Sequence, residues 1–220
     1  MSFELPALPV KPTLRGVLHH WAAFVAGGAG LVLVGMSPTW RAALASGVFA
    51  LSLVMLFTVS ATYHLVNWTP PARAWMRKAD HASIFILIAG TYTPVALLAL
   101  PPSVGTRLSW IVWGGATLGV LKSLFWAHSS KVITAALAVA VGWSIVPYIG
   151  EVRQSVAPGI IALVAAGGIA YTLGAVAYAT KRPDLKPGVF GYHELFHACT
   201  LVGAGLHFIA VLELVRAARG

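Results

Sequence analysis

Apolar residues occupy most of this chain in seven stretches, each about as long as a helix that crosses a lipid bilayer, which needs about 20 apolar residues. The predicted spans are 18–36, 42–65, 80–100, 107–127, 132–150, 157–179 and 193–215. Short polar or proline-containing segments separate them, so consecutive helices should be antiparallel neighbours. The alternation that marks the strands of a β-barrel never persists. The pattern therefore predicts an all-α fold, a bundle of seven membrane-spanning helices.

The composition agrees with a membrane protein. Hydrophobic residues make up 58% of the 220 residues and charged residues only 10%, whereas about 25% charged residues is typical of soluble domains. So few charges cannot cover a soluble protein of this size, which excludes a soluble enzyme and a disordered chain. We divide the chain into a short cytoplasmic segment, 1–17, and a single seven-helix membrane domain, 18–216.

The distribution of positive charge favours one orientation. Nine Lys and Arg residues lie before the first span and after the second, fourth and sixth spans. The opposite side carries five: Arg41, Arg107, Arg153, Arg216 and Arg219. Positive charge accumulates on the cytoplasmic side of membranes, which predicts a cytoplasmic N-terminus and an outside C-terminus. These loops account for the net charge of +9, so no nucleic-acid partner is expected.

Histidines gather at the cytoplasmic ends of the predicted spans. All eight except His207 lie there, and Asp80 begins the third span. Burying an ionisable group in a membrane costs a few kcal/mol, so such groups usually serve a function. A histidine at a helix end can instead be simply solvated, and this is what we expect of His19, His20 and His128.

Two further histidines and a proline motif carry weaker expectations. His81 follows Asp80 and points elsewhere, so it should be solvated or act indirectly. His207 lies ten residues beyond His197, about 15 Å deeper along a helix, and should meet another polar group inside the bundle. Gly90–Pro94 should bend the third span, because proline removes a backbone hydrogen bond.

The remaining polar residues form a pattern suited to a metal ion. Ser60 and His64 are spaced i, i+4 at the end of the second span, and His193 and His197 have the same spacing at the start of the last, so each pair shares a helix face. Three neutral histidines can hold Zn²⁺ at about 2.0–2.1 Å and leave a fourth position for water. Asp80 could accept or orient the proton of that water, and Ser60 could hydrogen-bond to it or to a substrate carbonyl. The spacing predicts a catalytic zinc site.

The segment His193–His197 also matches the H-E-x-x-H pattern of zinc proteases, in which Glu194 would be the general base. Glu194 points about 100° away from His193 around the helix, but true zinc proteases share that geometry. The chain lacks the second aspartate motif, deep in a later helix, that intramembrane metalloproteases carry. The protease is therefore the weaker hypothesis.

Three sequence blocks resemble the bacterial hemolysin III family, which is related to the progestin and adipoQ receptors and more distantly to alkaline ceramidases. The blocks are Ser60–His64, Asp80–Pro94 and His193–His197. The resemblance covers about 15–215 and implies seven helices, a cytoplasmic N-terminus and a zinc ion near the cytoplasmic face. The metal ligands it implies are His64, His193 and His197, with Asp80 holding a zinc-bound water and Ser60 matching the family's serine. The chain lacks the long N-terminal domain of the animal receptors, so hormone binding is not implied.

Three functions remain as hypotheses. The first is a zinc-dependent hydrolase of amide or ester bonds, with a membrane lipid or fatty-acyl ligand as its partner. The second is a non-enzymatic, receptor-like or membrane-homeostasis protein in which zinc is structural. The third is a pore-forming cytolysin, as the family name suggests, although the sequence has no ring of charged pore-lining residues. The hydrolase ranks first, and the sequence does not decide whether the chain is an enzyme.

Overall fold

A computed structural model describes residues 11–126 and 130–218. His128 and Arg219, which the sequence analysis places at a solvated helix end and on the outer side, lie outside these ranges. The elements are α1 (Val17–Gly35), α2 (Trp40–Leu65), α3 (Pro70–Pro94), η1 (Val95–Ala99), α4 (Pro102–Phe125), α5 (Lys131–Gly142), η2 (Val146–Tyr148), α6 (Ile149–Ser155), α7 (Pro158–Thr180) and α8 (Tyr192–Ala217). Seven stretches of these helices are long and apolar enough to cross a membrane. The prediction of an all-α, seven-span bundle is confirmed.

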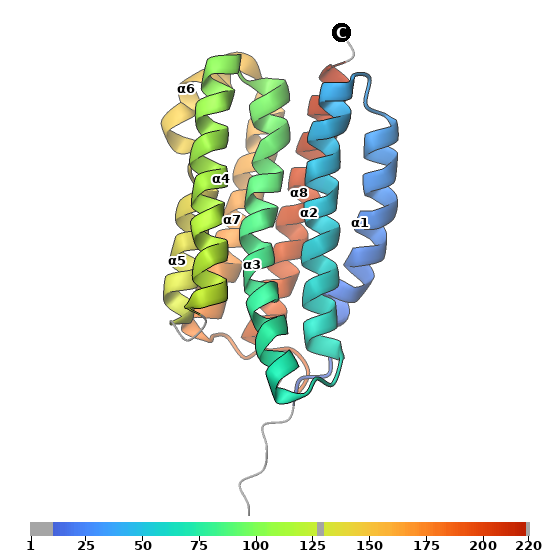
Figure 1. The fold of residues 1–220 in the computed structure, drawn as a ribbon, viewed down its shortest axis with the longest axis vertical. Helices are drawn as coiled ribbons and strands as arrows, with labels where there is room; N and C mark the ends of the chain where they lie inside the picture. Colours follow the sequence, from blue (N-terminus) through green and yellow to red (C-terminus); the bar gives the residue numbers. More distant parts are fainter. Residues whose placement is uncertain (1–10, 127–129, 219–220) are drawn as a thin grey trace, which may run out of the picture.

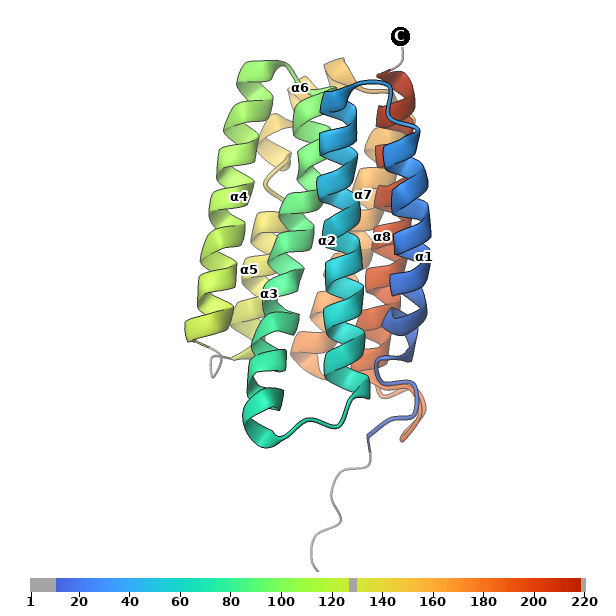
Figure 2. The same ribbon diagram turned by 45° about the vertical axis from the view of Figure 1, so that its right-hand side comes forward.

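The spans form a bundle in which the last span, α8, lies between α7 and α1. Neighbours in sequence pack side by side, and α8 contacts α1, α2 and α3 as well as α7. Figure 1 shows that the end of α2 and the beginnings of α3 and α8 lie at the same end of the bundle as the described N-terminal residues. Figure 2, turned by 45°, shows α1 running beside α8. The bundle therefore brings segments far apart in sequence together at one end.

The third span begins ten residues earlier than predicted. Pro70 and Pro71, which we expected to separate two spans, are the first residues of α3. Proline suits this position because the first N–H of a helix has no intrahelical partner and the ring fixes a helical φ. Asp80 therefore lies about 15 Å inside the helix, and the expectation that it begins the span is wrong.

The fifth span is a broken helix, where the sequence predicts a continuous one. α5 ends at Gly142, and a 3₁₀ turn containing Pro147 leads into α6. Tyr92 of α3 bridges the break: its hydroxyl donates to the Gly142 carbonyl (2.7 Å) and accepts from the Ile145 amide (3.1 Å). In a membrane interior such freed backbone groups need a protein partner, and the aromatic side chain supplies one.

The third span changes its winding after Pro94, where a bend was expected. The chain continues as the π-helix η1, and the hydroxyls of Thr91 and Thr93 donate to the carbonyls four residues before them. Proline cannot donate the next helical hydrogen bond, and a local π-turn is one way for the backbone to adjust.

We expect Gly105→Ala to destabilise the protein where α4 meets η1. A Cβ at Gly105 would lie 2.1 Å from the Ala96 carbonyl oxygen, so the backbones would have to separate. Overpacking of this kind costs about 1–3 kcal/mol. Gly114→Ala is the matched control, because a Cβ at Gly114 on the same helix meets nothing within 4 Å. Thermal unfolding in detergent should show a lower midpoint for Gly105→Ala alone; equal midpoints would contradict the close approach.

Candidate metal centre

Three histidines from two helices meet at the end of the bundle near the N-terminus. His64 lies in the last turn of α2, and His193 and His197 lie in the first two turns of α8. All three are buried, and one ring nitrogen of each lies within 4.8 Å of the others. The Nε2 atoms of His64 and His193 are 3.1 Å apart. The structure therefore brings together the three histidines that the sequence predicts as metal ligands.

This donor set fits a transition-metal ion. Tetrahedral coordination at about 2.0–2.1 Å places ligand nitrogens roughly 3.3 Å apart, close to the separation of the His64 and His193 nitrogens. Imidazole is a good ligand for zinc and for copper, iron and nickel. Nδ1 of His197 is buried and has no hydrogen-bond partner among the described residues. The three residues can hold a metal ion, and their chemistry alone does not select zinc.

Asp80 and Ser60 lie beside this cluster. An Asp80 carboxylate oxygen is 3.9 Å from Nε2 of His64, which is too long for a hydrogen bond. The Ser60 hydroxyl lies next to that carboxylate, and both residues line a cavity that also reaches His193 and His197. The Asp80 carboxylate is thus free to interact with a molecule in the cavity next to the histidines.

His19 is part of the centre, contrary to the expectation that it is solvated. Its side chain is only 2% exposed, and its ring stacks on that of His197 with centroids 3.8 Å apart. Phe57 of α2 packs against it as well. The sequence placed His19 at a helix tip, and no local pattern indicates that α1 passes beside the start of α8. Its stacking fixes the plane of the His197 ring.

Glu194 stabilises the start of α8 and does not line the cavity. The residue is fully buried. Its Oε2 accepts from the Gly191 amide at the start of α8 (2.9 Å), and its Oε1 pairs with Arg15. A carboxylate at this position satisfies an orphan N–H of the helix and complements its dipole. Because both oxygens are engaged away from the cavity, the geometry does not support Glu194 as the general base of a protease.

The N-terminal segment before α1 packs over this end of the bundle. The Lys11 ammonium donates to the His64 carbonyl, and the Thr13 amide donates to the Gly188 carbonyl (3.0 Å) in the loop before α8. Together with the Arg15–Glu194 pair, these contacts tie the segment to both helices that carry the triad. No pattern in the sequence predicts this role for the segment.

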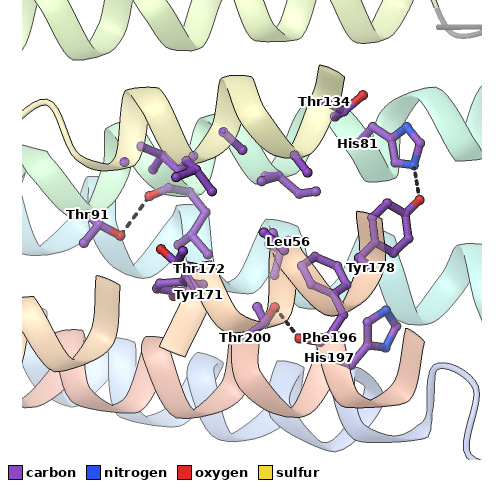
Figure 3. A pocket seen from close by; sticks show the side chains of 18 of the residues that line it. Leu56, His81, Thr91, Thr134, Tyr171, Thr172, Tyr178, Phe196, His197 and Thr200 are labelled. Carbon is purple, nitrogen blue, oxygen red and sulfur yellow. Dashed lines mark hydrogen bonds between the residues drawn. The ribbon is translucent and has the colours of Figure 1, made fainter. Parts of the chain in front are cut away.

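A long cavity runs from the triad into the bundle. Its walls come from α1, α2, α3, α5, α7 and α8, and it extends along α8 to His207, about 15 Å from His197. Figure 3 shows Leu56, Phe196 and Tyr178 pointing into it. His81 forms part of its wall, where its Nε2 lies 3.4 Å from the Tyr178 hydroxyl. His81 therefore lies outside the cluster of His64, His193 and His197.

Comparison with known proteins identifies the family. A family model described as haemolysin-III related matches residues 9–208. Hemolysin-3 of Bacillus cereus is 28% identical over 177 residues, covering 80% of this chain and 78% of that protein. Heptahelical transmembrane protein ADIPOR2 of Oryza sativa subsp. japonica is 30% identical over 180 residues (74% and 79%). Monocyte to macrophage differentiation factor of Homo sapiens is 24% identical over 171 residues (74% and 67%). The chain belongs to the haemolysin-III-related family of seven-helix, multi-pass membrane proteins.

Proposed function

We propose that the protein is a zinc-dependent hydrolase that cleaves an amide or ester bond of a membrane lipid. The observation that carries this proposal is the position of the three buried histidines and Asp80 at one end of a long cavity inside a membrane bundle. With the N-terminus in the cytoplasm, as the positive charges favour, this end lies in the cytoplasmic leaflet of the bacterial inner membrane.

The three histidines, Asp80 and Ser60 each have a separate role in the proposed hydrolysis. A zinc ion held by His64, His193 and His197 would polarise the lipid carbonyl and make water more acidic. Asp80 accepts the proton that the attacking water loses and returns it to the leaving amine or alcohol. The water oxygen bonds to the carbonyl carbon, the C–N or C–O bond breaks, and a fatty acid and an amine or alcohol result. Ser60 beside Asp80 helps to orient the carboxylate.

The cavity favours a lipid as the substrate. Most of the surface that lines it is apolar, so most of a hydrocarbon chain can lie there against apolar side chains. The hydrocarbon core of a bilayer is about 30 Å thick, so the chains of one leaflet span about 15 Å. The cavity covers a similar depth between His197 and His207. An acyl chain of ordinary length therefore fits between the triad and the middle of the bundle.

A structural metal is the second candidate. An ion at the triad would link α2 to α8 whether or not it acts on a substrate, and the stacking of His19 on His197 adds α1 to the same cluster. In that case chelation should lower the unfolding temperature, and the protein should release no lipid product.

Asp80→Asn tests the hydrolase. The wild-type protein in nanodiscs that contain ceramide and phospholipid should release fatty acid, detected by mass spectrometry. The variant should do so about 100-fold more slowly, the usual loss for a general base, and should retain its metal. Asp184→Asn, in the exposed loop before α8, is the control and should keep full activity. Absence of product from the metal-loaded wild type would reject the hydrolase in favour of the structural role.

A further inference from the structure

Two polar atoms in the middle of the bundle have no partner. The hydroxyl of Tyr171 on α7 and Nδ1 of His207 on α8 are buried and make no hydrogen bond with the described residues. Both residues line the far part of the cavity, and their ring centroids are 5.4 Å apart. An unpaired polar group inside a membrane protein is costly, so two such groups on residues that line one cavity require an explanation.

The two rings are held by close packing between the helices. A Cβ at Gly167 of α7 would lie 2.3 Å from the His207 ring, and a Cβ at Gly203 of α8 would lie 2.6 Å from the Tyr171 ring. Each ring thus fills the space left by a glycine on the opposite helix. Neither ring can turn away without losing this packing, so the polar atoms are fixed in place.

The tautomer of His207 defines what the pair can bind. Its Nε2 lies 3.0 Å from the Val164 carbonyl, and a carbonyl oxygen can only accept, so Nε2 carries the proton. In a neutral imidazole Nδ1 is then an acceptor. The Tyr171 hydroxyl can donate. A hydroxyl group of a ligand can donate a hydrogen bond to Nδ1 of His207 and accept one from the Tyr171 hydroxyl. A methylene group can form neither hydrogen bond.

Nearby polar side chains in the same part of the cavity are already paired. The Thr172 hydroxyl donates to the Gly168 carbonyl (2.7 Å) and accepts from the Trp143 indole (3.0 Å). The Thr91 hydroxyl donates to the Leu87 carbonyl (2.8 Å). Figure 3 shows Tyr171, Thr172 and Thr91 in this region. Among the described residues in this part of the cavity, the buried polar atoms without a partner are therefore those of Tyr171 and His207.

We propose that Tyr171 and His207 form a binding site for a hydroxyl group near the methyl end of an acyl chain. This inference rests on the proposed function, because it places the carboxyl end of the chain at the triad. His207 lies about 15 Å from His197 along α8, close to the length of one leaflet's chains. The ligand class is therefore a long-chain fatty acyl group hydroxylated at or near its last carbon.

Binding of palmitate and of ω-hydroxypalmitate to the full-length protein in nanodiscs tests this site. The wild type should bind the hydroxylated acid about tenfold more tightly, the gain expected from two hydrogen bonds of ordinary strength. Tyr171→Phe and His207→Phe should lose the preference and bind palmitate as the wild type does. Tyr148→Phe, which removes a hydroxyl from η2 outside the lining of this cavity, should keep it. Thermal unfolding of each variant verifies that the fold persists.

Three results would overturn the site. The first is equal affinity of the wild type for the two acids, which is expected if only water occupies the site. The second is a preference for the hydroxylated acid that survives in Tyr171→Phe. The third is failure of both acids to bind. The measurement needs no turnover, so it is separate from the hydrolase. A preference for the hydroxylated acid without lipid hydrolysis supports the hydroxyl site and rejects the hydrolase. Lipid hydrolysis without this preference supports the hydrolase and rejects the hydroxyl site.

Discussion

His64→Ala is expected to empty the metal centre and reduce lipid hydrolysis to the uncatalysed rate. The substitution leaves only the His193 and His197 ligands, both on α8. Loss of a residue that merely supports a ligand already weakens metal binding by about 10–100-fold, so loss of a ligand should cost more. Elemental analysis after purification without added metal, together with lipid product analysis, provides the measurement.

The control for this substitution is His20→Ala. His20 lies on α1 near the same end of the bundle as His64. Its ring packs on Trp21 and Phe24 and is not part of the triad. This variant should keep both metal and activity. A His64→Ala protein that retains a full equivalent of metal would show that the ion binds elsewhere, or that His64 is not a ligand.

Arg15→Met is expected to cause the largest loss of stability among substitutions outside the triad. Arg15 pairs with Glu194, whose side chain is 0% exposed. Removing one partner of a buried ion pair leaves an uncompensated charge and costs about 3–5 kcal/mol of the free energy of unfolding. The start of α8, and with it His193, should loosen. Unfolding in mixed micelles, followed by circular dichroism, measures the effect.

The double variant Arg15→Met, Glu194→Gln separates charge from packing. Glutamine removes the unpaired charge, while its amide oxygen can still accept from the Gly191 amide. Most of the lost stability should therefore return. A single Arg15→Met variant as stable as the wild type would show that the ion pair contributes little, and a double variant as unstable as the single one would assign the loss to packing.

The sequence predicts the spans well because the membrane imposes their length. The predictions from the sequence are wrong where a residue type has two structural uses or where a distant residue determines the local structure. Pro70 and Pro71 can end one segment or begin a helix, and in the structure they begin α3. The break after Gly142 depends on Tyr92, about fifty residues earlier in the chain, and no local pattern reports such a contact.

The candidate site likewise combines residues that the sequence predicts with residues that it does not. The i, i+4 spacing brings His193 and His197 onto one helix face, and the antiparallel order of spans places His64 at the same depth. His19 was missed because its role depends on α1 meeting α8. Glu194 lies inside a motif that also occurs in proteases, and its direction is set by Arg15 and Gly191. Tertiary contacts, which the local sequence does not encode, assign these last two roles.

X-ray absorption at the zinc edge, on wild-type protein purified without added metal, tests the central claim most directly. We predict one zinc ion per chain, bound by three histidine nitrogens at about 2.0–2.1 Å, with the signal lost in His64→Ala. Protein that is folded and active but contains no zinc, or whose zinc signal is unchanged in that variant, would contradict the account.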